Sequence, residues 1–265
     1  MISDYHLHTC FSTDSEASVS DVLDAAISKG MKSLCITDHE DMDYNDKKEF
    51  EINIDEYYPA MCKYKESYKD RIDLRIGVEL GLQPHLAKRL SDFADRYPLD
   101  FVIGSTHIVN HIDPYFKEYW EGRSPKEAVL EYYQSILASL KVCNNFDVYG
   151  HLDYVTRYVP DKSVDVSWIV FQDEITCILK KLIASGKGIE INTGGLYKGT
   201  NDTNPSLSIL RRYKELGGEI ITVGSDAHKA SLIGYGFEKA QAILKEAGFS
   251  YYTTFCSRKP EFHTI

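Results

Sequence analysis

Short apolar runs alternate with longer amphipathic segments along the whole chain. The short runs are rich in Ile, Val and Leu and end at polar residues, which predicts buried strands. The longer segments carry apolar residues three and four positions apart, which predicts helices with one buried face. The predicted strands are residues 2–8, 33–37, 74–78, 99–105, 146–150, 188–192 and 219–224, with 251–255 as a closing strand. The predicted helices are residues 18–30, 55–69, 84–96, 124–143, 167–185, 204–216 and 237–247.

The order of these elements predicts the fold class. Strand and helix alternate seven times, which calls for parallel strands joined by helical crossovers. No Gly/Ser-rich linker or shift of composition divides the chain, so residues 1–265 are predicted to form one domain. We expect an α/β fold of the closed, TIM-like barrel type, because polar residues stand at the carboxyl end of nearly every strand. An open, doubly wound sheet, in which ligands gather at one switch point, is the alternative.

Length and composition agree with such a barrel, which typically needs about 250 residues. No apolar run reaches the roughly 18 residues of a membrane-spanning helix, and no basic region followed by an apolar stretch opens the chain, so no secretory signal is expected. The six cysteines are scattered without a CxxC pair, which is typical of reduced thiols in a cytoplasmic protein. Cys10, near the first histidines, is expected to be buried filler rather than a metal ligand.

The net charge of −10 argues against binding to nucleic acid or to an anionic membrane. It does not exclude an anionic substrate, because bound divalent cations make a pocket positive even in an acidic protein. We therefore expect a small-molecule ligand. The sequence makes no prediction of the oligomeric state.

Ionisable residues at the strand ends form the candidate site. His6 and His8 lie two apart in a predicted strand, so their imidazoles share a face, although an isolated pair of this kind often arises by chance. Further residues of metal-binding types follow the later strands. These are Asp38 and His39, Glu79, His107, His151 and Asp153, Asn192, and Asp226 with His228, joined by Asp14 from the first loop. Because so many ionisable groups at one end of a barrel are costly unless paired or metal-bound, the pattern predicts a site with several metal ions.

The same residues carry a resemblance to a known family. The matching motifs are Asp4-Tyr5-His6-Leu7-His8-Thr9, Thr37-Asp38-His39, Gly77-Val78-Glu79, Gly104-Ser105-Thr106-His107, Gly150-His151-Leu152-Asp153 and Ser225-Asp226-Ala227-His228. With these motifs in family order, the chain resembles the PHP (polymerase and histidinol phosphatase) superfamily. Residues 115–128 are similar to an insertion of the histidinol-phosphate phosphatase branch, which the short bacterial tyrosine phosphatases of the superfamily lack.

The resemblance implies a distorted (β/α)7 barrel that holds three divalent metal ions. The implied ligands are His6, His8, Glu79 and Asp226 for the first ion, Glu79, His107 and His151 for the second, and Asp14, His39 and His228 for the third. Glu79 would bridge the first two ions. Some relatives carry a histidine at the position of Asp14, but a carboxylate is a competent, harder ligand. Mixed imidazole and carboxylate ligands accept zinc, iron or manganese, and the sequence does not choose among them.

The resemblance further implies a phosphomonoesterase that converts L-histidinol phosphate to L-histidinol and phosphate in histidine biosynthesis. A hydroxide held between two metal ions would attack phosphorus, and the cationic pocket would stabilise the phosphoryl oxygens. No phospho-enzyme is expected, because no Asp or Ser nucleophile motif stands out.

Substrate contacts are less directly indicated. Arg157, on the loop after the fifth strand, is expected to clamp the phosphate rather than to lie exposed. Lys198 stands near the position of a second phosphate-binding arginine in the family. Asp153 would either protonate the leaving oxygen or, as we slightly favour, orient His151. His111, or the aromatic residues of 115–120, would contact the imidazole of the substrate.

Three other functions remain open at this stage. The first is a PHP phosphoesterase that acts on another small ester, such as a nucleotide or sugar phosphate. The second is an amidohydrolase, which also begins with an HxH motif but commonly bridges its metals with a modified lysine, where this chain has Glu79. The third is a non-catalytic, metal-stabilised binding module like the degenerate PHP domains of polymerases, which typically lose the ligands that this chain keeps.

Overall fold

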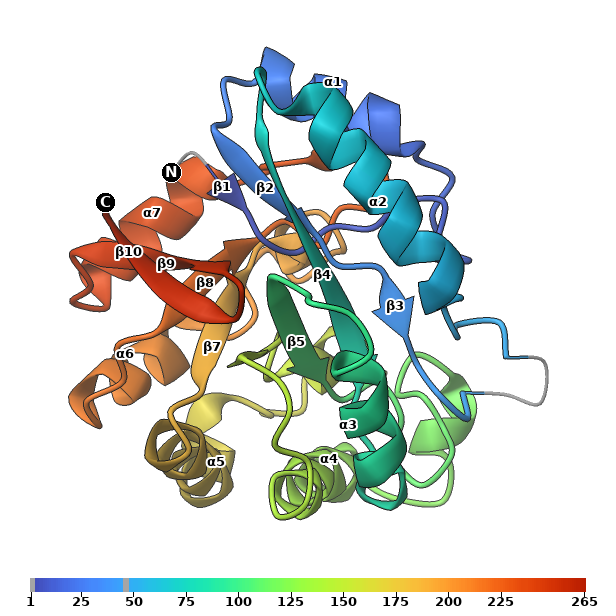
Figure 1. Cartoon of the computed structure of the whole chain (residues 1–265). Helices are drawn as coiled ribbons and strands as arrows, with labels where there is room; N and C mark the ends of the chain where they lie inside the picture. Colours follow the sequence, from blue (N-terminus) through green and yellow to red (C-terminus); the bar gives the residue numbers. More distant parts are fainter. Residues whose placement is uncertain (1–2, 45–47) are drawn as a thin grey trace.

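A parallel sheet forms the centre of the computed structural model, which describes residues 3–44 and 48–265 (Figure 1). The strands, in spatial order, are β1 (Ser3–Asp4), β2 (Ser33–Ile36), β4 (Asp73–Gly81), β5 (Phe101–Ser105), β6 (Val148–Tyr149), β7 (Gly188–Asn192) and β8 (Ile221–Gly224). The short strand β3 (His39–Glu40) continues the line of β2 and also pairs with β4. Spatial order therefore follows chain order, as expected when each strand is followed by a helical crossover.

The sheet closes on itself between its first and last strands. Beyond β1, the chain continues in extended form along β8, where Leu7 and Ala227 form a parallel bridge. The main-chain N–H of Tyr5 donates to the carbonyl of Val223 (2.9 Å), and that of His8 donates to the carbonyl of Ala227 (2.9 Å). The prediction of a distorted (β/α)7 barrel is confirmed, and the open doubly wound sheet is wrong.

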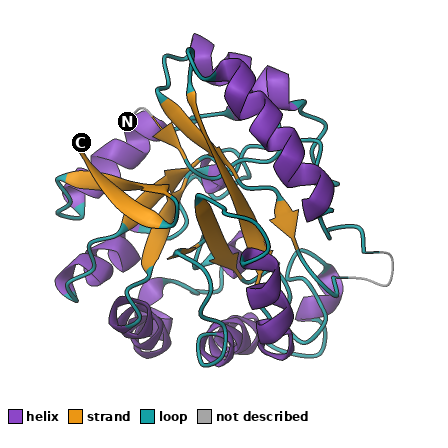
Figure 2. Ribbon diagram, viewed as in Figure 1, coloured by secondary structure: helices purple, strands orange, loops and turns teal. Residues whose placement is uncertain are grey.

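Helices surround the barrel, as Figure 2 shows. They are α1 (Val19–Ser28), α2 (Ile54–Tyr68), α3 (Ala87–Ala94), α4 (Pro125–Ser139), α5 (Gln172–Ala184), α6 (Leu207–Glu215) and α7 (Phe237–Glu246). Two begin at serine caps, since Ser18 accepts a hydrogen bond from the N–H of Asp21 and Ser124 forms a capping box with Glu127. The helix predicted over 204–216 begins only at Leu207, because the main chain of Asn204 pairs with Asn192 instead.

The last predicted strand does not close the barrel. Instead β9 (Tyr251–Cys256) and β10 (Lys259–Thr264) form a separate antiparallel hairpin. Its turn docks at the amino end of β5, where Ser257 and Arg258 donate main-chain hydrogen bonds to Asp100. The hairpin therefore covers the amino-terminal end of the barrel, opposite the strand ends that carry the candidate ligands.

An apolar cluster fills the barrel behind this hairpin. Phe255 from β9 is buried with residues of four barrel strands or their extensions, which are Tyr5, Cys35, Phe101, Ile103 and Val148. The Tyr5 hydroxyl donates to the carbonyl of Phe255 (3.1 Å). The predicted strand 2–8 is thus realised as β1 and an extended continuation, with residue 2 outside the described part of the chain.

Candidate metal centre

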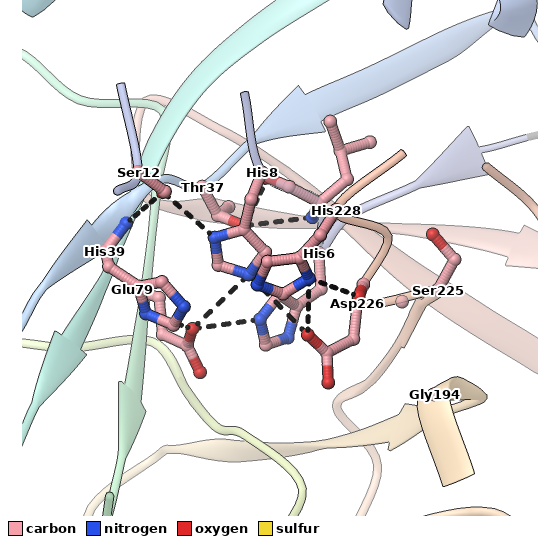
Figure 3. A network of polar contacts seen from close by, with 12 residues as sticks. His6, His8, Ser12, Thr37, His39, Glu79, Gly194, Ser225, Asp226 and His228 are labelled. Atoms are coloured by element: carbon pink, nitrogen blue, oxygen red, sulfur yellow. Dashed lines mark hydrogen bonds and ion pairs between the residues drawn. The ribbon is translucent and has the colours of Figure 1, made fainter. Parts of the chain in front are cut away.

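Imidazoles and carboxylates from the ends of the barrel strands meet in one buried cluster (Figure 3). Glu79 lies in β4 and His39 in β3, Asp14 lies in the loop before α1, and the other members follow β1, β5, β6 and β8 within four residues. The rings of His6 and His8 lie 5.2 Å apart, as expected for side chains two apart in an extended segment. The nine residues predicted as ligands lie close together, and these are His6, His8, Asp14, His39, Glu79, His107, His151, Asp226 and His228.

Glu79 is fully buried at the middle of this cluster. Its Oε1 accepts hydrogen bonds from Ser105 Oγ (2.6 Å) and lies 2.9 Å from His151 Nε2. Its Oε2 lies 3.1 Å from both His6 Nε2 and His39 Nδ1, yet it has no hydrogen-bond partner among the described residues. A carboxylate whose two oxygens face imidazole nitrogens on both sides has the position of a bridging ligand.

Several buried nitrogen and oxygen atoms of the cluster have no hydrogen-bond partner in the described chain. They are His6 Nε2, His8 Nε2, His39 Nδ1, His151 Nδ1 and Glu79 Oε2. His151 faces Glu79 with its Nε2 and not with the unpaired Nδ1. Unpaired polar atoms are costly in a protein interior, and the other four converge, since the three imidazole nitrogens lie 3.1 to 3.6 Å from Glu79 Oε2. Bound cations would satisfy them, and imidazole with carboxylate is a donor set that zinc, iron and manganese accept. The residues present therefore fit a metal centre.

Four sets of ligand atoms lie close enough to share an ion, with all atoms of a set within 4.8 Å of one another. The sets are His6, His8 and Asp226; His6, Glu79 and His151; His39, Glu79 and His107; and His8, His39 and His228. Each of these sets shares at least two residues with one of the three ligand groups expected from the sequence. For the third group, Asp14 Oδ2 lies 3.0 Å from His228 Nε2 and 3.7 Å from His39 Nε2. Asp14 is also the most exposed of its group, with 40% of its side chain accessible.

Charges within the cluster are strongly coupled. Burial disfavours the charged form of Glu79, but the imidazoles of His6 and His107 hold its pKa well below the usual value. Burial also opposes protonation of His39, yet the carboxylates of Asp41 and Glu79 raise its pKa to about 10. By contrast, burial together with neighbouring His39 and His228 lowers the pKa of His8 well below its usual value. Protons and metal ions would therefore compete for these ligands.

Two carboxylates that the sequence analysis missed contact Nδ1 of two of the histidines, the ring nitrogen that faces away from the cluster. Glu190 Oε1 lies 2.6 Å from His6 Nδ1, and Asp41 Oδ1 lies 2.9 Å from His107 Nδ1. Each accepts the ring proton on that side, which leaves the Nε2 atom facing the cluster. Alternation in the strand 188–192 puts Glu190 on the same face as Asn192, so that signal was present. Asp41 depends on strand β3, which was not predicted.

A glycine makes room for the first of these pairs. A side-chain carbon at Gly224 of β8 would lie 2.3 Å from Glu190 Oε1 and 2.3 Å from His6 Cβ. Only glycine therefore lets β8 pass this close to His6. Asp38, another neighbour of the site, accepts hydrogen bonds from Thr9 and Ser12 and so fixes the turn after His8.

Two cationic side chains reach the cluster at Asp226. Arg157 Nη1 and Lys198 Nζ donate to the same oxygen, Asp226 Oδ2, over 3.2 and 3.1 Å. Although burial opposes it, Lys198 and His8 hold the pKa of Asp226 well below its usual value. Arg157 is buried, so the alternative of an exposed loop arginine is wrong.

Three further residues were singled out from the sequence, and the structure contradicts the expectation for two of them, Asp153 and Cys10. Asp153 does not bond to His151; its carboxylate accepts hydrogen bonds from Asn204 Nδ2 (2.7 Å) and the N–H of Ser206 (3.1 Å). The idea that Asp153 orients His151 is therefore wrong in this structure. His111 is exposed on a tight turn, with its ring 6.1 Å from that of His85. Cys10 is exposed rather than buried, so its predicted role as filler is also wrong.

Comparison with known proteins gives consistent matches over the whole chain. A family model described as the PHP domain matches residues 4–194. The histidinol-phosphatase of Lactococcus lactis is 34% identical, over 97% of this chain and 95% of that protein. A probable histidinol-phosphatase of Clostridium acetobutylicum is also 34% identical, over 99% of this chain and 96% of that protein.

One solved structure matches closely in three dimensions. It is the histidinol phosphate phosphatase of Lactococcus lactis in complex with zinc, L-histidinol and phosphate, with a TM-score of 0.90. The two proteins are 32% identical in this comparison, which covers 98% of both chains. A putative histidinol phosphatase from Listeria monocytogenes, 20% identical with a TM-score of 0.78 over 89% of this chain and 99% of that one, shares the fold.

Proposed function

The chain belongs to the PHP domain family, and we propose that it is a metal-dependent phosphomonoesterase that hydrolyses L-histidinol phosphate to L-histidinol and phosphate. The observation that carries this proposal is the cluster of unpaired imidazole and carboxylate atoms around Glu79. The substrate is supported by the full-length similarity to histidinol-phosphatases and by the structure that holds zinc, L-histidinol and phosphate. Histidine biosynthesis is the pathway that this reaction would serve.

We assign three divalent ions to the cluster. The proposed ligands are His6, His8, Glu79 and Asp226 for one ion, Glu79, His107 and His151 for the next, and Asp14, His39 and His228 for the third. Zinc is supported by its presence in the Lactococcus lactis enzyme, and iron and manganese suit the same donors. When bound, such ions would lower the pKa of water to supply a nucleophile near neutral pH and would offset the charge of the phosphate.

The residues of the chain itself divide the remaining tasks. Glu190 and Asp41 orient the imidazoles of His6 and His107. Arg157 and Lys198, whose charged groups meet at Asp226, would hold the phosphoryl oxygens and stabilise the charge that builds up on them.

We place the organic part of the substrate beside the segment of residues 108–122. Asp113 anchors this segment next to the cluster, because it accepts hydrogen bonds from the hydroxyls of Tyr44 (2.9 Å) and Tyr154 (3.2 Å). The exposed rings of Tyr115 and Phe116, together with His111, are available to contact an imidazole. Trp120 is not, since it is buried and donates to the carbonyl of Pro114.

The wider assignments follow from the same proposal. Residues 1–265 would act as one phosphoesterase domain with a small-molecule substrate. Nucleic acid and membranes are not expected partners, because the net charge is −10. Among the described residues, no helix has the length and apolarity needed to cross a bilayer. We propose a cytoplasmic location, as is usual for a biosynthetic enzyme with free cysteines.

Removal and return of metal tests the proposal. Protein stripped with a chelator and then dialysed should release no phosphate from L-histidinol phosphate, and added zinc, iron or manganese should restore release. Circular dichroism on the stripped sample provides the control that the protein is still folded. Full activity in protein shown by elemental analysis to hold no metal would contradict the proposal.

A further inference from the structure

Arg157 is held on three sides by buried side chains. Its Nε donates to Asn204 Oδ1 (2.7 Å), Nη1 donates to Asp226 Oδ2 (3.2 Å), and Nη2 donates to Asn192 Oδ1 (3.0 Å). A guanidinium carries five N–H bonds, so one remains on each terminal nitrogen. A fork fixed in this way is preorganised to bind two oxygens of a phosphoryl group.

The contact with Asn204 depends on which way its amide faces. The main chain of Asn204 is fixed, because it exchanges two hydrogen bonds with Asn192 (2.8 and 2.9 Å). Its side chain presents Oδ1 to Arg157 and donates from Nδ2 to Asp153 Oδ1 (2.7 Å). An ionised carboxylate only accepts hydrogen bonds, so Asp153 fixes the amide in the orientation that Arg157 requires.

The hydrogen bonds of Asp153 go to residues other than the proposed metal ligands. Both of its oxygens accept hydrogen bonds, one from Asn204 and the other from the N–H of Ser206. Asp153 also lines a cavity of about 490 Å³, and none of the nine proposed metal ligands lines it. Trp168 and Ile209 line the same cavity. A general acid would instead have to reach the leaving oxygen beside the metal cluster.

We infer that Asp153 is a positioning residue that acts through Asn204 on Arg157, and that it does not protonate the leaving group. The inference deepens the proposed function and rests on it. Without an acceptor at position 153, the amide of Asn204 is free to turn and present a donor to Arg157 Nε. The guanidinium then loses its anchor on that side and no longer meets the phosphate in the correct position.

The experiment compares two phosphate esters that differ in their need for a general acid. The leaving group of L-histidinol phosphate is a poor one, an alkoxide, whereas 4-nitrophenyl phosphate expels 4-nitrophenolate, a stable anion that needs no proton. Loss of a general acid slows only the first, by about a hundredfold or more. A misplaced Arg157 slows both to the same degree, by about ten- to a hundredfold, because it binds the phosphoryl group common to both.

The variants are Asp153→Ala, Asp153→Asn and the control Asp202→Asn, which changes an exposed carboxylate two residues before Asn204 in the segment between β7 and α6. We expect Asp153→Ala to lower kcat/KM for both esters equally and to weaken inhibition by inorganic phosphate. Asp153→Asn keeps an acceptor for Asn204 and should lose less on both esters. In an Arg157→Ala background, Asp153→Ala should lower kcat/KM no further, because the guanidinium through which Asp153 acts is already absent.

Loss confined to L-histidinol phosphate, equal for both Asp153 variants, would overturn the inference in favour of a general acid. The inference would also be overturned if Asp153→Ala lowered kcat/KM in the Arg157→Ala background by the same factor as in the wild-type protein. If Asp153→Ala fails to fold, Asn204→Ala removes the same link and carries the same expectations. Failure of the wild-type protein, loaded with metal, to hydrolyse either ester would instead contradict the proposed function, so the two failures are distinguishable.

Discussion

Glu190 Oε1 lies 2.6 Å from Nδ1 of His6, and both side chains are buried. The two residues are 184 positions apart in the chain, and β7 and the segment after β1 bring them together. This carboxylate sets the tautomer of the imidazole, so that Nε2 is the nitrogen offered to the metal centre. The position of Glu190 thus extends the site beyond the residues that would touch metal.

The variant Glu190→Gln should weaken zinc binding by about 10- to 100-fold, because the imidazole loses a charged acceptor that raises its basicity. The affinity is measured by competition with a chromophoric chelator. Glu238→Gln, at an exposed position of α7, is the matched control and should leave the affinity unchanged. Equal affinities for the two variants would show that Glu190 does not support the metal centre.

Zinc binding to stripped protein at pH 7 should release protons. Despite burial, carboxylate neighbours raise the pKa of His39 to about 10, and they also raise the pKa of His6 and His107. These imidazoles are therefore protonated before zinc arrives, and the affinity should fall as the pH is lowered. Calorimetric titrations in buffers of different ionisation enthalpy measure the number of protons released. The same binding enthalpy in every buffer would contradict this expectation.

Substitution Lys198→Ala should weaken phosphate binding less than Arg157→Ala does. Lys198 is partly exposed and contributes one hydrogen bond to Asp226, whereas Arg157 is buried and forms three hydrogen bonds. We expect the inhibition constant of inorganic phosphate to rise by about tenfold for Lys198→Ala, the equivalent of one charge-assisted hydrogen bond. A larger rise for Lys198→Ala than for Arg157→Ala would reverse the roles assigned here.

The hairpin should stabilise the barrel without taking part in chemistry. Phe255 is buried at the amino-terminal end, away from the ligands. Its truncation in Phe255→Ala should lower the free energy of unfolding by about 3 to 5 kcal/mol, as for other buried phenylalanines. Urea unfolding of the zinc-loaded protein measures this loss, while the metal content should stay the same. A loss of bound metal in folded Phe255→Ala would contradict the claim that the hairpin end of the barrel is independent of the end that carries the metal ligands.

The sequence predicts the barrel well because its signals are local. Apolar runs mark the strands, and a polar residue at the end of each run is carried to the same rim once the strands are parallel. That geometry brings His6, Glu79 and Asp226 together although they come from three separate motifs. The seven-strand barrel follows from the same alternation of elements.

What the sequence does not reveal depends on contacts between distant segments. Residues 251–255 have the pattern of a strand, but the pattern does not identify β10 as their partner. The pairs formed by Glu190 and Asp41 join residues 184 and 66 positions apart. For Asp153, closeness in the sequence was misleading. It lies only two residues from His151, but it stands at the start of the 3-10 turn Tyr154–Tyr158 and its side chain contacts Asn204 instead.

The most direct test of the account is the rate of phosphate release from L-histidinol phosphate, measured beside nucleotide, sugar and tyrosine phosphates. Metal content is determined on the same chelator-free sample, and His8→Ala serves as the site variant. We expect kcat/KM for L-histidinol phosphate to exceed the other values by about a hundredfold or more, and His8→Ala to abolish it. Hydrolysis of other esters but not of this one would refute the substrate. Full metal occupancy with no hydrolysis of any ester would contradict the enzyme itself and favour a binding module.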